Sequence, residues 1–308
     1  MRMARAYSPA GISSFFEFAD HNRNNVRITD PLQIGARGGG FVISRGVQTE
    51  VRVDRRRKDK IIVYMNDQPK EDARVSETVV RTLLDRGKIH ARVTVHHIIE
   101  PPIGCGCGTS GAGALSTALA LCKALDLEMT YNQIGQVAHV AEIACKTGLG
   151  TVAPLMVGGN VITIQPGAPG LCMIDRIPLE PNYLIVLGWF GPISKSAVLS
   201  DQNIQTKINR YGRSALEQIL KEPTPENFMI ACRRFAENAG FMTKRLRHLL
   251  SVMKKGGAIG ATQNMLGEAG HALVEERKIM SVYEAARSIL PKKQIMISTV
   301  ESGVARLI

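Results

Sequence analysis

The segment that most restricts how this chain can fold is a glycine-rich stretch at residues 102–113. Its last ten positions hold five glycines and two hydroxyl side chains. Glycine lacks a Cβ atom and tolerates positive φ, so successive backbone N–H groups can turn toward one bound anion. The segment therefore predicts a phosphate-binding loop. The alternative is a turn that lets a strand and a helix pack closely.

The residues around the glycines support the phosphate-binding interpretation. An Ala- and Leu-rich run at residues 112–125 predicts a buried helix, whose first turn adds free N–H donors and partial positive charge. Two hydroxyls at the helix start can bond phosphate oxygens or a metal ion. Cys105 and Cys107 are interpreted as small side chains that fill space. The predicted phosphate-binding residues are Gly104, Gly106, Gly108, Thr109, Ser110, Gly111 and Ala112.

The elements on either side of the loop mix strands and helices. Residues 89–99 alternate between apolar and polar side chains, which predicts a half-buried strand, and Pro101 and Pro102 end it. The sequence at residues 130–133 matches a capping box, which predicts a helix that ends near Gly148. Further expected elements of this half are extended segments at 40–44 and 47–53 and a helix at 76–85.

A second group of elements follows a stretch rich in Gly and Pro at residues 149–170. Prolines at 178 and 181 mark a boundary, which divides the chain into domains at residues 1–180 and 181–308. The second domain is expected to contain strands at 183–187 and 295–300, helices at 200–220, 224–239 and 243–255, and a glycine-bearing stretch at 256–270. The predicted fold class is α+β with two domains.

Composition narrows the class of protein. The chain has 308 residues, of which 44% are hydrophobic and 21% charged, as in a globular protein. No run approaches the roughly 18 apolar residues of a membrane helix, and no apolar signal core follows Met1. Six cysteines without a C-x-x-C pair fit a cytoplasmic protein. We expect no membrane partner.

The net charge of +12 indicates anionic partners, either nucleic acid or small metabolites. Its densest run, residues 54–60, lies between two alternating segments and is interpreted as an exposed hairpin turn. Aromatic residues make up 5% of the chain, and none interleaves with that run as a base-stacking surface requires. We therefore expect no nucleic-acid partner.

Two other phosphate-binding motifs compete for the loop. Residues 106–111 satisfy G-x-G-x-x-G, but the dinucleotide fold needs a second strand that ends in an acid, and Asp126 precedes a helix-capping segment instead. A Walker A loop needs Gly-Lys-Ser/Thr, and Lys123 is the first lysine after the glycines. The context therefore favours a different kind of nucleotide loop.

These residues resemble the GHMP kinase superfamily, and within it the archaeal pantoate kinases. The superfamily pattern P-x-x-x-G-x-G-S-S-A is met at residues 102–111, with Thr109 for the first Ser and Gly111 for the Ala. The likeness to pantoate kinases covers nearly the whole chain. It is carried by the segments 8–17, 35–40, 138–142, 147–150 and 257–267.

The resemblance implies an N-terminal domain like the second domain of ribosomal protein S5 and a ferredoxin-like C-terminal domain, with ATP between them. It implies transfer of a phosphoryl group from ATP to pantoate, giving 4-phosphopantoate for coenzyme A biosynthesis. By position, Ser110 and Glu142 match the catalytic residues that bind Mg²⁺, and hydroxyl and carboxylate oxygens suit that ion. Without the family, a solvated helix residue is the alternative interpretation of Glu142.

The substrate contacts are less specific. Arg37 lies among small residues and could clamp the carboxylate of pantoate in a bidentate fork, or it could be a surface arginine on a turn. His21 and Thr262 are the other candidates, Thr262 because it lies in the second glycine-bearing stretch. A homodimer is left open.

Two positions depart from the family pattern. Many GHMP kinases carry an Asp base after the motif at residues 148–150, where this chain has Thr151, and a Lys where it has Ile12. A threonine hydroxyl holds its proton too tightly to act as a base at neutral pH. We therefore expect catalysis by positioning and charge neutralisation without a protein base. Alternatives are a homoserine- or mevalonate-like substrate, or a homologue that binds nucleotide without catalysis.

Overall fold

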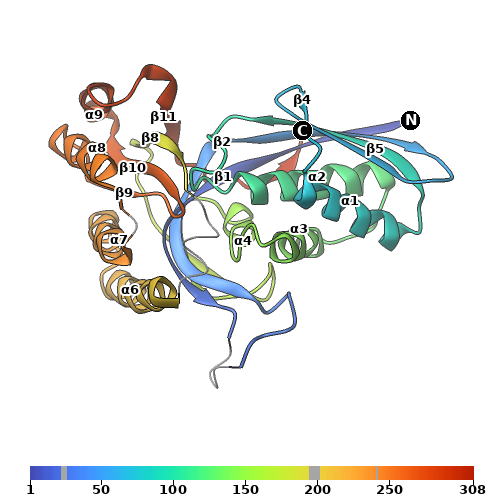
Figure 1. The fold of residues 1–308 in the computed structure, drawn as a ribbon, viewed down its shortest axis with the longest axis horizontal. Helices are drawn as coiled ribbons and strands as arrows, with labels where there is room; N and C mark the ends of the chain where they lie inside the picture. Colours follow the sequence, from blue (N-terminus) through green and yellow to red (C-terminus); the bar gives the residue numbers. More distant parts are fainter. Residues whose placement is uncertain (22–25, 194–201, 241) are drawn as a thin grey trace.

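The protein folds into two lobes, each built on its own β-sheet (Figure 1). The structure is a computed structural model that describes residues 1–21, 26–193, 202–240 and 242–308. Strands β1 (Arg2–Ala19) and β2 (Gly35–Arg55) form one long antiparallel pair that curves from the first lobe through the middle of the molecule.

The first sheet has the strand order β12-β1-β2-β5-β3-β4, and β6 joins it beside β2. One half of β2 pairs with β5 and the other half with β6, so two branches of the sheet share this strand. Gly40 lies within the paired region of β1 and β2, and a Cβ there would be 1.8 Å from the carbonyl oxygen of Ile12. The other strands are β3 (Lys60–Met65), β4 (Gln68–Pro69), β5 (Ala91–Ile99), β6 (Asn160–Gln165), β7 (Met173–Ile177) and β12 (Arg306–Leu307).

The order of these strands corrects one prediction. The basic run at residues 54–60 is exposed as expected, but the strands on either side of it do not form a hairpin. β5 lies between β2 and β3 and pairs with β3 in parallel. The run is therefore a crossing loop between two strands that are not neighbours.

Three helices cover one face of the first sheet: α1 (Arg74–Gly87), α2 (Thr109–Leu125) and α3 (Tyr131–Cys145) (Figure 1). α2 is buried on nearly all sides, as its Ala-rich sequence predicts. The capping box at Thr130 is present, because its hydroxyl accepts from the Gln133 amide and the Gln133 side chain accepts from the Thr130 amide. A one-turn helix, α4 (Val152–Leu155), follows.

The second sheet has the strand order β11-β8-β10-β9, all antiparallel. In chain order this is 4-1-3-2 with βαββαβ connections, which is the ferredoxin-like arrangement. The predicted α+β class with a ferredoxin-like C-terminal part is thereby confirmed. Its elements are β8 (Tyr183–Pro192), α6 (Gln202–Lys221), α7 (Pro225–Ala239), α8 (Lys244–Lys255), β9 (Gly260–Gln263), β10 (Gly267–Glu275), η1 (Glu276–Lys278), α9 (Ile279–Arg287), η2 (Lys292–Gln294) and β11 (Ile295–Thr299).

The two lobes share a hydrophobic core. Phe15 of β1 and Phe41 of β2 pack edge-to-face against Phe228 of α7. β12 returns from the C-terminus to pair with β1, so the last residues of the chain belong to the first sheet. The division at residue 180 separates the other strands of the two sheets and stays a prediction.

Most predicted elements are present with ends shifted by a few residues, and the extended segments at 40–44 and 47–53 are parts of the single strand β2. The longer elements that were not predicted include β1, β6, β7, β10 and α9. Ser200 and Asp201 of the predicted helix at 200–220 lie outside the described residues. In the part of the chain that the structure describes, no helix is both long enough and apolar enough to cross a membrane.

Candidate active site

The glycine-rich loop has the backbone that anion binding requires. Gly104, Gly106 and Gly108 have φ angles of 78°, 73° and 59°, in the left-handed region. Within the described residues, the amides of residues 104–108 donate to no backbone carbonyl. Gly108 is the N-cap of α2 and has no side chain to cap it, so the amides of Thr109, Ser110 and Gly111 have no partner inside the helix. The loop and helix start therefore offer a set of N–H donors that phosphate oxygens can satisfy.

The carbonyls of the loop point the other way, into the protein. Cys105 O accepts from the side chain of Asn264 at 3.0 Å, and Cys107 O accepts from the amide of Gly11 at 3.2 Å. Gly106 O accepts from the amide of Ser13 at 3.4 Å. C=O and N–H point in opposite directions across a trans peptide, so these three bonds turn the next three amides toward the outside of the loop.

Close packing at the inner side explains why glycine is needed here. A Cβ at Gly106 would lie 2.7 Å from Met265 O, and one at Gly108 would lie 2.9 Å from Gly11 O. The loop thus lies between β1 of the first sheet and the turn at 264–267 that joins β9 to β10 of the second.

Glu142 reaches the start of α2 from α3. A Cβ built on Gly111 would lie 3.3 Å from Glu142 Oε2, and one on Gly148 would lie 2.4 Å from the same atom. The hydroxyl of Thr147 donates to Glu142 Oε1. With 2% exposure, Glu142 is a buried carboxylate beside a helix N-terminus and not a solvated residue. Its position suits a Mg²⁺ ligand shared with phosphate oxygens and water.

Thr151 stands at the same helix start. Its methyl carbon would lie 2.7 Å from a Cβ on Gly108 and 3.0 Å from one on Gly111. The residue that replaces the family's aspartate therefore faces the first turn of α2 and the Glu142 carboxylate. No cluster of three or more His, Cys, Asp or Glu side chains that could hold a metal by itself occurs among the described residues.

Three other residues of the segment have structural explanations. Ala112 donates its amide to Gly108 O at 3.0 Å, so this amide is not available to a phosphate. Burial raises the pKa of the Cys105 thiol to about 11, and it raises the pKa of Cys107 further. Both thiols stay protonated at neutral pH, which agrees with their interpretation as filling residues.

Arg37 is bound to a carboxylate of the protein itself. Its guanidinium holds Glu17 in a bidentate pair at 2.7 and 2.8 Å, and Arg213 of α6 donates to the same carboxylate at 2.9 and 3.2 Å. The Glu17 side chain is 3% exposed and that of Arg37 35%. Arg37 is thus held in place by Glu17. Only its remaining N–H groups can bind a substrate.

The other two predicted substrate contacts lie elsewhere. His21 is exposed, contacts Asp20 at 3.0 Å and bridges to Arg27, so these contacts do not join it to the loop. Thr262 is fully buried in β9, paired with His271 of β10. All four residues of β9 are buried, so Thr262 lies in the protein interior, and its contact with substrate stays a prediction.

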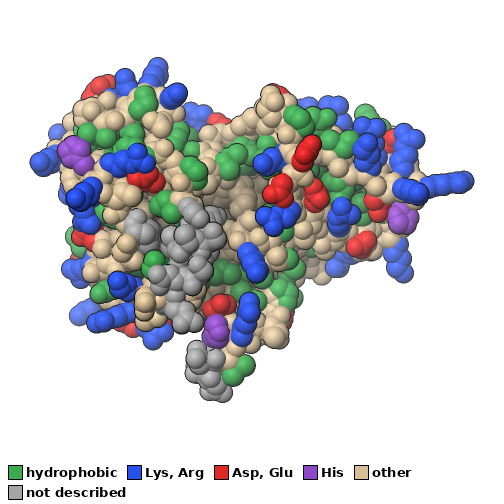
Figure 2. Space-filling view, viewed as in Figure 1, with side chains coloured by type: hydrophobic (Ala, Val, Ile, Leu, Met, Phe, Trp, Pro, Cys, Tyr) green, Lys and Arg blue, Asp and Glu red, His purple; other side chains and the backbone are tan. Residues whose placement is uncertain are grey.

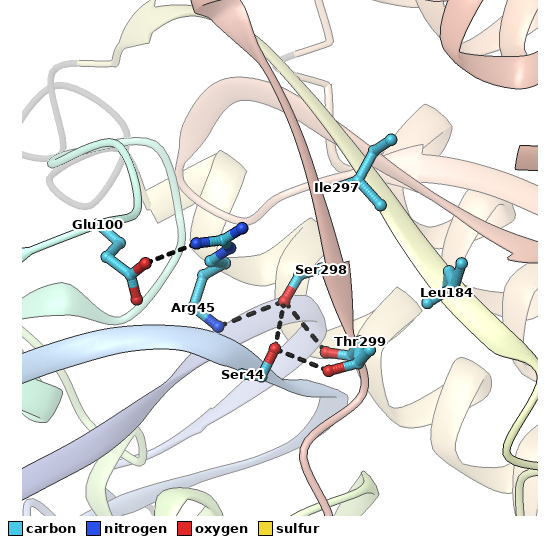
Figure 3. Close-up of a pocket in the computed structure, with 7 residues that line it drawn as sticks. All are labelled: Ser44, Arg45, Glu100, Leu184, Ile297, Ser298 and Thr299. Carbon is cyan, nitrogen blue, oxygen red and sulfur yellow. Dashed lines mark hydrogen bonds and ion pairs between the residues drawn. The ribbon is translucent and has the colours of Figure 1, made fainter. Parts of the chain in front are cut away.

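The surface is hollowed between the two lobes (Figure 2). One hollow of about 270 Å³ lies at the junction of β2 and β11, outside the glycine loop (Figure 3). Arg45 there pairs with Glu100 at 2.8 Å, and Ser44 bonds Ser298 at 3.1 Å. Its lining residues are Ser44, Arg45, Glu100, Leu184, Ile297, Ser298 and Thr299.

Sequence reasoning missed three contacts that the fold makes in this region. The Thr147 hydroxyl donates to Glu142, Arg37 and Arg213 both donate to Glu17, and the Asn264 amide donates to Cys105 O of the loop. The Thr-Gly-Leu-Gly sequence at 147–150 was a signal for the first. The Asn264–Cys105 and Arg213–Glu17 contacts join residues 159 and 196 positions apart, and no local pattern indicates them.

Comparisons with known proteins agree with this geometry. The GHMP kinases N-terminal domain family matches residues 74–159, which contain the loop and Glu142. A pantoate kinase of Thermococcus kodakarensis is 33% identical over 279 residues, covering 90% of this chain and 89% of that protein. A solved structure described as a phosphotransferase related to the CoA biosynthesis pathway superposes with a TM-score of 0.89 at 30% identity, over 99% of this chain and 98% of that one.

A homoserine kinase from Cytophaga hutchinsonii has a TM-score of 0.73 at 14% identity, over 100% of this chain and 98% of that one, and this likeness shows the fold alone. Fold and loop together define a kinase of the GHMP class. Within that class, the chain belongs to the pantoate kinase family.

Proposed function

We propose that this protein phosphorylates pantoate with ATP, giving 4-phosphopantoate for coenzyme A synthesis. The observation that carries the proposal is the set of outward amides at the start of α2, in a chain 33% identical over 90% of its length to a pantoate kinase. The predicted substrate class, a small hydroxy acid, follows from the same relatives.

The residues of the loop bind and orient. The amides of residues 106–111 would hold the phosphates of ATP, with the helix start supplying partial positive charge. Ser110 and the buried Glu142 would hold Mg²⁺, which neutralises charge on the transferred phosphoryl group. The remaining N–H groups of Arg37, fixed by Glu17, would bind the carboxylate of pantoate.

The reaction would proceed without a protein base. Thr151 presents its methyl group to the helix start and its neutral hydroxyl to Gly148, and a neutral hydroxyl cannot remove the proton of the attacking 4-hydroxyl. Phosphoryl transfer has a loose transition state, and alignment plus charge neutralisation can supply most of the rate. The proton of the hydroxyl would then leave late, to an oxygen of the transferred phosphate.

The test is an assay of the full chain with ATP, Mg²⁺ and D-pantoate. We expect ADP and a phosphorylated pantoate in equal amounts. Homoserine and mevalonate serve as competing acceptors, and turnover faster on either would reassign the substrate. ATP binding without ADP formation on any acceptor would contradict the proposal and indicate a non-catalytic homologue.

A further inference from the structure

A buried chain of hydrogen bonds connects β1 and β10 to the phosphate loop. Ser14 Oγ lies 3.0 Å from His271 Nε2, and His271 Nδ1 lies 2.8 Å from Asn264 Oδ1. Asn264 Nδ2 lies 3.0 Å from the carbonyl oxygen of Cys105. All three side chains have 0% exposure, so water does not compete for these bonds.

The chemistry of the groups fixes the direction of each bond. A carbonyl oxygen only accepts, so Asn264 must present its NH₂ group to Cys105 and its oxygen to His271. The imidazole must then carry its proton on Nδ1, which leaves Nε2 to accept from the Ser14 hydroxyl. Burial lowers the pKa of His271 to about 3, so the ring is neutral at physiological pH.

The last bond of this chain controls an amide of the nucleotide site. Cys105 O and the N–H of Gly106 belong to one planar peptide and point in opposite directions. The glycines on both sides of Cys105 have left-handed φ values of 78° and 73°, a flexible backbone that could otherwise rotate. Holding the carbonyl inward therefore holds the Gly106 N–H outward.

We propose that Ser14, His271 and Asn264 form a positioning relay that orients the Gly106 amide toward a phosphate of ATP. The inference rests on the proposed function, because it takes the loop to be the nucleotide site. It assigns to β10 and to the 264–267 turn of the second lobe an indirect part in nucleotide affinity. None of the three residues touches the nucleotide; they act through the loop backbone.

A buried asparagine elsewhere in the same lobe provides a matched control. Asn227 of α7 is 8% exposed and also donates to backbone carbonyls, at 3.1 Å to Gln218 O and 2.7 Å to Glu222 O. These bonds connect α7 to the C-terminal end of α6, and they hold no part of the loop. Replacing either asparagine by alanine removes a buried amide, but only one of them governs the loop.

The first experiment measures ATP affinity and stability for Asn264→Ala and Asn227→Ala in the full chain. We expect both variants to melt at lower temperature than the wild type. Asn264→Ala should raise the Kd and KM for ATP at least about fivefold, the loss of one hydrogen bond, with a smaller change in kcat at saturating ATP. Asn227→Ala should leave the Kd for ATP within about twofold. Equal Kd values for the two variants would overturn the relay.

The second experiment uses a conservative replacement of the histidine. In His271→Asn, the amide nitrogen takes the place of Nδ1 and can still donate to Asn264. In His271→Leu, no donor remains. We expect ATP affinity to decrease in the order wild type, His271→Asn, His271→Leu. If the two variants bound ATP equally well, the histidine would be a packing residue only.

A double-mutant cycle tests whether the members act as one chain. Ser14→Ala and Asn264→Ala together should raise the Kd for ATP by less than the product of their separate effects, because either change alone interrupts the chain. Multiplicative effects would contradict a relay. Ser14→Ala removes one oxygen atom and provides the readout if Asn264→Ala does not fold.

ATP binding by the wild-type protein distinguishes a failure of the proposed function from a failure of the relay alone. If it binds no ATP in the same titration, the proposed function fails and the relay fails with it. If it binds ATP and the Asn264 and His271 variants bind ATP as tightly, the relay alone is wrong.

Discussion

At the scale of single residues, Thr151 and Ser110 carry opposite expectations although both are hydroxyl residues at the start of α2. Ser110 is expected to contact phosphate or metal, and its contribution grows as charge develops in the transition state. Thr151 presents its methyl group to the same helix turn. Replacing each of the two residues therefore tests whether catalysis depends on alignment and charge neutralisation or on a protein base.

Ser110→Ala should therefore lower kcat by about 10²-fold or more, the usual cost of a lost transition-state contact. Thr151→Ala should lower it by less than about threefold, a change too small for a lost base. Rates of ADP formation at saturating ATP and pantoate give both values. A Thr151→Ala enzyme that still binds ATP but has no turnover would disprove base-free catalysis.

Arg37 and Arg213 allow a second comparison, because both hold Glu17. Arg37→Ala should raise the KM for pantoate at least about tenfold, as expected for a lost charged contact to a carboxylate, and leave the KM for ATP unchanged. Arg213→Ala removes the more exposed partner of the same carboxylate. If Arg37 served Glu17 alone, the two variants would lose stability together and neither would change the KM for pantoate.

At the scale of elements, the link between α3 and α4 positions the carboxylate of Glu142. Gly148 and Gly150 lie in this link two residues apart, yet their surroundings differ. A Cβ at Gly148 would lie 2.4 Å from Glu142 Oε2, whereas one at Gly150 would meet Ala36 at an ordinary 3.4 Å. At Gly148 a side chain would collide with the Glu142 carboxylate, whereas Gly150 has room for a Cβ atom.

Gly148→Ala should displace the Glu142 carboxylate and lower kcat at least about tenfold, because small misplacements of a catalytic group cost that much. Gly150→Ala is the control and should keep kcat within about twofold. Steady-state rates with both variants check the expectation. Similar rates for the two would mean that Glu142 is not needed where the structure places it.

At the scale of the whole molecule, buried histidines connect stability to pH. Burial lowers the pKa of His97 to about 4 and that of His271 to about 3, and it also lowers the pKa of His139. These pKa values lie below the unfolded value of about 6.5, so the unfolded state binds more protons in acid. The stabilising effect is complete above pH 6.5 and is lost as the pH falls toward the folded values.

Between pH 6 and pH 5, the histidines should dominate this dependence, since carboxylates such as Glu268, whose pKa Arg245 lowers, are still ionised in both states. The free energy of unfolding should fall by up to about 1.4 kcal/mol per pH unit for each of His97 and His271. Urea unfolding at several pH values measures the slope. His97→Gln should reduce this slope by the contribution of one proton. An unchanged slope would mean that His97 does not cause the pH dependence.

The predictability of the site followed the range of the interactions. The positive φ angles of the loop glycines, the helix after them and the capping box at Thr130 depend on residues within a few positions of each other, and the sequence predicted all three. Phosphate binding by the loop stays a prediction. Glu142 was found through the family pattern and not through its surroundings. The role of Arg37 in substrate binding stays a prediction, and the Glu17 carboxylate that it shares with Arg213 was not foreseen.

The sequence by itself determined the α+β class, most helices and the glycine loop, because glycine conformation, hydrophobic periodicity and capping are local properties of the chain. Only the tertiary structure decided that β5 lies between β2 and β3, that Thr262 is buried, and that His271 and Asn264 reach the loop. Such contacts depend on which distant surfaces pack together. Their free energy is set by burial and geometry across the whole fold, and no short stretch of sequence contains it.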